Sequence, residues 1–217
     1  MNLIIDIGNT RVKAAVFEGN TIINLMIFNK SRIISEVKKI IKNFQIKATI
    51  VSSVSSITSF KMEKLNKIVH FTTVSSSIDT PFKNLYATPK TLGVDRIALV
   101  FGAVIKYPKK NILIIDAGTC ITFDFINKDA EYLGGAISPG IKIRYKSLHD
   151  YTSKLPLLSI KKPNNFLGNS TVESINSGVV NGVVQEIDGV INQYKKKYTD
   201  LTVVLTGGDT NFLSKQL

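Results

Sequence analysis

Cysteine and histidine are scarce in this sequence, which limits the covalent and metal chemistry open to it. Among 217 residues there is one cysteine, Cys120, so no internal disulfide can form. A chain without disulfides fits a reducing compartment. The two histidines, His70 and His149, stand in no metal-ligand spacing, and no second cysteine could join them. We expect structural or surface roles for both.

Long hydrophobic runs are also absent. Asp6 and Arg11 interrupt the apolar N-terminal stretch, which a signal peptide would keep continuous. The apolar run 112–115 is far too short to cross a bilayer. With 44% hydrophobic residues, the chain can still bury a substantial core. We therefore expect a soluble, cytoplasmic protein.

Acidic residues are few beside basic ones, with 16 Asp and Glu against 28 Lys and Arg, a net charge of +12. The lysines are scattered over segments such as 30–44 and 194–198 rather than grouped into an arm. That distribution is typical of solvated helix faces and loops. A positive field also favours an anionic substrate such as a nucleotide, and charge alone leaves nucleic-acid binding open.

What the sequence does contain is one motif twice. The letters LIIDIGNT at 3–10 return as LIIDAGTC at 113–120. Around each copy the pattern predicts a strand, an Asp-x-Gly turn, a strand, a turn and a strand. The predicted strands are 2–7, 11–17 and 21–28, then 111–116, 119–126 and 131–137. This echo indicates an internal duplication with a boundary near residues 107–111.

The remaining apolar spacing predicts mainly helices. They are expected at 31–44, 57–68, 95–105 and 171–194 and after Gly140, with further strands at 48–53 and 201–205. Ser31 is the expected N-cap of its helix. Gly178, Gly182 and Gly189 weaken the helix 171–194, so we expect close helix packing there.

The repeated turn suits phosphate chemistry. Glycine lets the backbone approach a ligand, and the freed amides can hold phosphate oxygens. The aspartate would repel phosphate directly, so it is better placed beside a bound cation or water. In the first copy Asn9 and Thr10 add donors and Lys13 adds a positive charge. Two such turns could clamp a nucleotide polyphosphate, although one motif alone is more often the polar tip of a hairpin.

The loops together resemble those of a known superfamily. Asp6-Ile-Gly-Asn-Thr10, followed by Lys13, is similar to the first phosphate loop of the acetate and sugar kinase/Hsp70/actin superfamily. Asp116-Ala-Gly-Thr119 resembles its second phosphate loop, and the Thr-Gly-Gly-Asp stretch 206–209 resembles its adenosine loop. Neither a Walker A pattern nor GxGxxG is present. The resemblance implies an α/β protein with a duplicated ribonuclease H-like (actin-like ATPase) fold, in which each half-domain has a mixed five-stranded sheet flanked by helices.

Other stretches resemble the type III pantothenate kinases. They are TLGVDRIALVFGA at 91–103, YLGGAISPGIKIRYKSL at 132–148, the Leu-Pro pair at 155–156 and GNSTVESINSGVVNGV at 168–183. The similarity spans 2–209 in family order. The segment 142–145 is more basic than the family pattern, and the chain after Asp209 is brief. If this leaves the adenine side of the site open, weak ATP binding with a high KM is expected.

The resemblance implies two half-domains with separate tasks. Residues 1–108 would carry the first phosphate loop and the Gly-x-Asp-Arg segment. Residues 109–217 would carry the second phosphate loop, the adenosine loop and a dimerisation surface. The family resemblance also implies a homodimer.

The implied activity is ATP-dependent phosphorylation of pantothenate to 4′-phosphopantothenate, the first step of coenzyme A biosynthesis. By resemblance, Asp95 is the general base that takes the proton of the substrate hydroxyl. The residues implied at the pantothenate site are Tyr86, Gly93, Val94, Arg96 and Thr171, with Arg96 suited to a carboxylate. Without the resemblance, Tyr86 would be a packing residue and Thr171 a helix cap.

The same resemblance implies the nucleotide and metal ligands. The residues implied at ATP are Asp6, Gly8, Asn9, Thr10, Lys13, Gly118 and Thr119. Asp6 would hold the Mg²⁺ of Mg-ATP through water. Asp116 matches a monovalent cation site for potassium or ammonium.

Three other functions stay open at this point. A kinase of the same fold could act on a sugar or another small hydroxyl compound, because fold does not fix substrate. A non-catalytic transcription accessory factor could use the positive charge, although dispersed lysines argue against a dedicated face. A two-metal nuclease could use Asp6 and Asp116, but it would need more converging carboxylates.

Overall fold

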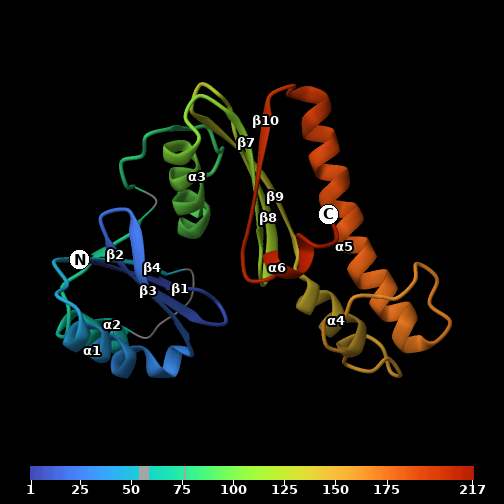
Figure 1. Cartoon of the computed structure of the whole chain (residues 1–217), viewed down its shortest axis with the longest axis horizontal. Helices are drawn as coiled ribbons and strands as arrows, with labels where there is room; N and C mark the ends of the chain where they lie inside the picture. The colour runs from blue at the N-terminus through green and yellow to red at the C-terminus, as the bar shows by residue number, and fades with distance from the viewer. Residues whose placement is uncertain (54–58, 76) are drawn as a thin grey trace. The chain divides into compact units, whose positions relative to one another are not determined.

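The computed structural model describes residues 1–53, 59–75 and 77–217. It divides into two compact units, the first comprising Met1–Asp79 and Thr88–Ala98 and the second comprising Thr80–Ala87 and Leu99–Leu217. Each unit contains one five-stranded sheet with helices beside it (Figure 1). The division into half-domains 1–108 and 109–217 stays a prediction. No helix among the described residues is long and apolar enough to span a membrane.

The first unit is built on the predicted meander. β1 (Asn2–Ile7), β2 (Val12–Glu18) and β3 (Thr21–Phe28) pair antiparallel in sequence order. β4 (Ala48–Ser53) lies parallel to β1 on its other side, and β5 (Thr72–Thr73) follows β4. The sheet order is therefore β3-β2-β1-β4-β5, and the strands predicted from residues 2–28 and 48–53 are confirmed.

One face of this sheet forms the core of the first unit. Leu3, Ile5 and Ile7 alternate along β1 and are fully buried, as period-2 alternation requires. The helices α1 (Ile33–Asn43) and α2 (Ser59–Asn66) cover that face and contribute to the same apolar cluster.

The predicted cap at Ser31 is wrong. Ser31 lies inside a short 3-10 turn, η1 (Lys30–Arg32), so the N-cap of the α-helix is Arg32, one residue later, with no side-chain cap bond. Residues 57 and 58 of the predicted helix 57–68 lie outside the described part of the chain.

The second unit repeats the arrangement. β7 (Asn111–Ala117), β8 (Cys120–Ile126) and β9 (Glu131–Pro139) form an antiparallel meander, and β10 (Leu201–Thr206) lies parallel to β7. The order β10-β7-β8-β9 matches β4-β1-β2-β3 of the first unit, which confirms the predicted duplication. The units differ at the edge, where β6 (Lys83–Asn84) extends the second sheet beside β9.

Three helices bury one face of the second sheet. α4 (Ile141–Asp150) and α5 (Thr171–Lys197) pack on β7 and β8, and α6 (Thr210–Leu213) adds Leu213 (Figure 1). The close packing expected at Gly178, Gly182 and Gly189 is wrong, because a Cβ at any of them would meet nothing within 4 Å.

One helix passes from the first unit into the second. η2 (Pro89–Thr91) leads into α3 (Val94–Lys106), and the helix predicted at 95–105 is confirmed. The first residues of α3 belong to the first unit and the rest to the second. The Gly-x-Asp-Arg segment therefore begins the helix within the first unit.

Candidate active site

The first phosphate loop is the tight turn between β1 and β2. The Gly8 N–H donates to the Arg11 carbonyl at 3.1 Å, which closes the turn, and leaves Asn9 and Thr10 exposed at its tip. Directly before the turn, Asp6 lies opposite Lys13 in the antiparallel register. The sequence places a carboxylate and an ammonium group beside a turn that a ligand can approach.

Charges in the first unit act on Asp6. Burial raises the pKa of its carboxyl above the ordinary value, the nearby Asp95 carboxylate raises it further, and Lys13 lowers it. Asp6, Lys13 and Asp95 therefore lie close enough to interact, although Asp95 is almost 90 residues away in sequence. A cation at this place would relieve the repulsion between the two carboxylates.

The backbone at the start of α3 holds Asp95 in place. Its Oδ1 accepts a hydrogen bond from the Arg96 N–H at 2.9 Å. A Cβ on Gly93 would lie 2.5 Å from that same Oδ1, so the carboxylate occupies space that only a glycine leaves open. Arg96 itself is buried, with 5% of its surface exposed. The Gly-x-Asp-Arg segment thus fixes one carboxylate oxygen against the backbone.

The second phosphate loop follows β7 in the second unit. The Gly118 N–H donates to the Cys120 carbonyl at 2.9 Å, a tighter turn than the one at Gly8. The N-terminal end of α4 packs on this loop, because the Gly140 N–H donates to the Thr119 carbonyl at 3.1 Å. A Cβ on Gly140 would lie 2.2 Å from the Gly118 carbonyl oxygen and 2.4 Å from that of Thr119.

The adenosine loop lies directly against Asp116. β10 runs parallel to β7 with Thr206 opposite Asp116, and the chain then turns at Gly207 with φ +101°. A Cβ on Gly207 would lie 2.3 Å from the Ala117 carbonyl oxygen and 2.5 Å from Asp116 Oδ1. The Asp209 N–H completes the contact by donating to that Ala117 carbonyl at 2.9 Å.

Sequence reasoning missed one charged residue here. Burial raises the pKa of Asp209, and Lys142 in the first turn of α4 opposes the shift. The signal was the basic segment 142–145, which departs from the family pattern. Lys142 therefore adds a positive charge beside the adenosine loop.

Tyr86 packs against a neighbouring tyrosine, and both belong to the second unit. Its ring stacks on Tyr132 with centroids 6.1 Å apart and an interplanar angle of 24°. Gly134 makes room for it, since a Cβ there would be 3.1 Å from the Tyr86 ring. The Tyr132 hydroxyl in turn donates to buried Asp124 at 2.6 Å. Tyr86 thus rests on a fixed aromatic platform.

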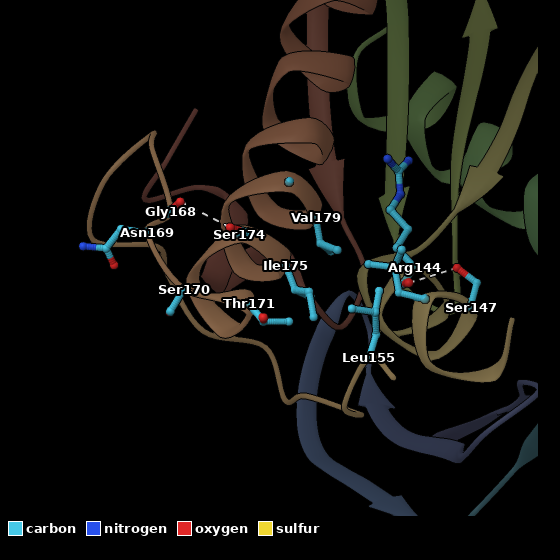
Figure 2. Close-up of a pocket in the computed structure, with 12 residues that line it drawn as sticks. Arg144, Ser147, Leu155, Gly168, Asn169, Ser170, Thr171, Ser174, Ile175 and Val179 are labelled. Atoms are coloured by element: carbon cyan, nitrogen blue, oxygen red, sulfur yellow. Dashed lines mark hydrogen bonds between the residues drawn. The ribbon is translucent and has the colours of Figure 1, made fainter. Parts of the chain in front are cut away.

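Thr171 lines a pocket of about 950 Å³ between α4 and α5. Figure 2 shows Thr171, Ile175 and Val179 on α5, with Leu155 and the α4 residues on the other side. The α4 side is anchored by Arg144, whose guanidinium donates to Ser138 Oγ and the Pro139 carbonyl, each at 2.9 Å, and pairs with Glu186. Ser170, not Thr171, caps α5, because its Oγ accepts from the Glu173 N–H. The Thr171 side chain is therefore not used by the cap.

The predicted site residues divide between the units. The first unit holds Asp6, Gly8, Asn9, Thr10, Lys13, Gly93, Val94, Asp95 and Arg96. The second holds Tyr86, Asp116, Gly118, Thr119 and Thr171. Among the described residues, no three His, Cys, Asp or Glu side chains gather into a metal site of their own.

The matching family model and the similar curated proteins all belong to one family. A family model for type III pantothenate kinase matches residues 2–193. The type III pantothenate kinase of Flavobacterium johnsoniae is 48% identical over 220 residues, covering 100% of this chain and 89% of the relative. That of Bacteroides fragilis strain YCH46 is 40% identical over 210 residues, covering 96% of this chain and 86% of the relative.

Solved structures share the fold at lower identity. A predicted Baf family transcriptional activator from Campylobacter jejuni superposes with a TM-score of 0.63 at 22% identity, over 99% of this chain and 87% of its own. The activator of the 2-hydroxyisocaproyl-CoA dehydratase from Clostridium difficile, solved with bound ADPNP, gives 0.54 at 12% identity, over 99% and 83%. Together with the strand order, these likenesses confirm the predicted duplicated ribonuclease H-like fold.

Proposed function

Because the chain belongs to the type III pantothenate kinase family, it phosphorylates pantothenate with ATP in coenzyme A biosynthesis, and we propose that Asp95 is the general base of this transfer. The supporting observation is the fixed carboxylate at the start of α3. One Asp95 oxygen accepts from the Arg96 N–H and fits the space left by Gly93. The other oxygen has no hydrogen bond from the described residues.

That second oxygen would take the proton. As the primary hydroxyl oxygen of pantothenate attacks the γ-phosphorus of ATP, its proton passes to Asp95 and ADP leaves. A base of this kind contributes about 10²–10⁴-fold to the rate. Fixing the carboxylate against the backbone lowers the entropy cost of reaching this geometry.

The first phosphate loop would hold the polyphosphate. The N–H groups and side chains around Gly8, Asn9 and Thr10 can donate to phosphate oxygens, and Lys13 supplies a positive charge. Asp6 would hold Mg²⁺ through a bound water, which fits its position beside Asp95, where a cation relieves repulsion. Bound Mg²⁺ would supply charge neutralisation at the phosphates.

Asp116 would hold the monovalent cation, potassium or ammonium. The carboxylate lies against Gly207 and beside the Ala117 carbonyl, and oxygen donors of this kind suit such an ion. Gly118 and Thr119 in the same turn would contact ATP.

The acceptor would be recognised by the five residues that the family resemblance implies. Gly93, Val94 and Arg96 would form one part of the pantothenate site, with the guanidinium on the substrate carboxylate. Tyr86 and Thr171 would form the other part. A cytoplasmic homodimer, with half-domains 1–108 and 109–217, completes the proposal.

The decisive assay follows pantothenate-dependent ADP release with Mg-ATP and potassium. Asp95→Asn should lower kcat by at least about 100-fold while ATP still binds. Asp129→Asn is the matched control, because Asp129 is exposed in the turn between β8 and β9. Unchanged turnover in Asp95→Asn would remove the base role. ADP release with a sugar but not with pantothenate would assign a different acceptor.

A further inference from the structure

A second, smaller cavity lies at the N-terminal end of α5. Its volume is about 220 Å³. The segment 161–167 forms one wall and the first turns of α5 form the other. The lining residues are Lys161, Lys162, Pro163, Asn164, Asn165, Leu167, Ser170, Val172, Glu173 and Asn176. None of these was assigned a role in phosphoryl transfer.

The hydrogen bonds of Tyr145 fix the orientation of Asn176. Asn176 is 6% exposed, and its Oδ1 accepts from the Tyr145 hydroxyl at 2.7 Å. The same hydroxyl receives a hydrogen bond from the Lys161 backbone, and burial raises the pKa of Tyr145, so the hydroxyl keeps its proton. Its single proton must therefore go to Asn176, which requires the amide oxygen at that position.

The amide nitrogen of Asn176 is then left for the cavity. Nδ2 has no hydrogen-bond partner among the residues that the structure describes. Because Asn176 is 6% exposed and lines the cavity, this remaining donor is available to water or to a ligand that accepts from it there. This donor is independent of the helix end, and it is fixed rather than free to rotate.

Most other polar groups around the cavity also favour an anion. Lys161 and Lys162 bring two positive charges, and the first turn of the 27-residue helix α5 adds its positive dipole end. Glu173 acts against them, since its carboxylate also lines the cavity. Part of that carboxylate is already engaged, with Oε2 accepting from the Asn169 N–H at 3.4 Å.

We propose that this cavity binds a tetrahedral oxyanion, a phosphate group, held by the Asn176 amide, Lys161, Lys162 and the first turn of α5. A phosphate group fits easily in 220 Å³. Its source would be either free inorganic phosphate or the end of a phosphate monoester. The inference does not depend on the kinase reaction, because its readout is binding.

The test is calorimetric titration of the full chain with inorganic phosphate at constant ionic strength. Asn176→Asp keeps an oxygen for the Tyr145 proton but replaces the amide donor by a carboxylate, so affinity should fall at least about tenfold. Lys162→Gln should weaken binding by about threefold or more, and Glu173→Gln should strengthen it by a similar factor. Lys154→Gln, an exposed lysine outside the cavity, should change nothing.

A variant of the first phosphate loop separates this cavity from the nucleotide site. If Thr10→Ala removes phosphate binding while Asn176→Asp and Lys162→Gln do not, phosphate binds in the nucleotide loop and the inference is overturned. Absence of any saturable binding also overturns it. If Asn176→Asp does not fold, the opposite shifts of Lys162→Gln and Glu173→Gln still decide the matter. Titration with glycerol 3-phosphate identifies the source: equal affinity indicates a monoester, and much weaker affinity indicates the free ion.

Discussion

Replacing Gly207 by alanine tests the contact between the adenosine loop and Asp116. The φ of +101° at Gly207 is strained for any residue with a Cβ, at a cost of about 1–2 kcal/mol. The added Cβ would also lie 2.3 Å from the Ala117 carbonyl oxygen. An ordinary carbon–oxygen contact needs about 3.3 Å, so the loop must retreat by roughly 1 Å.

That retreat has a further cost. It pulls on the hydrogen bond from the Asp209 N–H to the same Ala117 carbonyl, which is worth about 1 kcal/mol. Together with the backbone strain, we expect Gly207→Ala to lower the free energy of unfolding by about 2–3 kcal/mol. For a chain of this size the midpoint of thermal unfolding should fall by roughly 4–12 °C.

The neighbouring glycine supplies the control. A Cβ on Gly208 meets nothing within 4 Å, so Gly208→Ala should change the stability by no more than about 0.5 kcal/mol. Urea unfolding of both variants measures the difference, and Gly207→Ala should also raise the KM for ATP, because the displaced loop touches Asp116. Equal stability of the two variants would refute the contact.

Three further predictions concern other parts of the chain. Gly189→Ala should raise the free energy of unfolding by about 0.5–1 kcal/mol in urea melts, because the site is helical and open; a loss would mean that a partner covers it. Asp6→Asn should abolish ADP release yet raise the thermal midpoint at pH 7. The raised pKa of Asp6 means that its stability contribution is present below its ordinary pKa of 3.8 and is lost at higher pH, so wild type and variant should converge in acid. Tyr132→Phe should cost about 1–3 kcal/mol in urea melts by removing the bond to buried Asp124, and an unchanged midpoint would show that bond to be dispensable.

Periodicity was a reliable guide to long elements and a poor guide to their ends. Along 2–7 the apolar run gives a strand with the observed bounds, because burial of one face determines every second residue. β5 and β6 have two residues each, too few to show any period. Ser31 has the right chemistry for a cap, but the 3-10 turn places Arg32 there instead.

The sequence predicts which residues belong to the candidate site better than it predicts which of them contact each other. Short motifs identify the loops, since each depends on a local turn at Gly8 or Gly118. The contact of Gly207 with Asp116 joins positions 91 residues apart and follows from the parallel pairing of β10 with β7, which no local pattern contains. Asp6 and Asp95 interact across a similar separation.

The duplicated turn explains why two copies of one motif would divide the chemistry between them. In the first unit the turn tip is exposed, and the aspartate before it has charged neighbours, Lys13 and Asp95. In the second unit glycines cover the turn, because Gly140 packs on Thr119 and Gly207 packs on Asp116. An open turn between mixed charges suits a polyanion with its divalent cation. A covered aspartate among carbonyl oxygens suits a weakly hydrated monovalent cation. Replacing potassium by sodium should therefore lower the activity of the wild type but change little in Asp116→Asn, and equal sensitivity of both proteins would place the cation elsewhere.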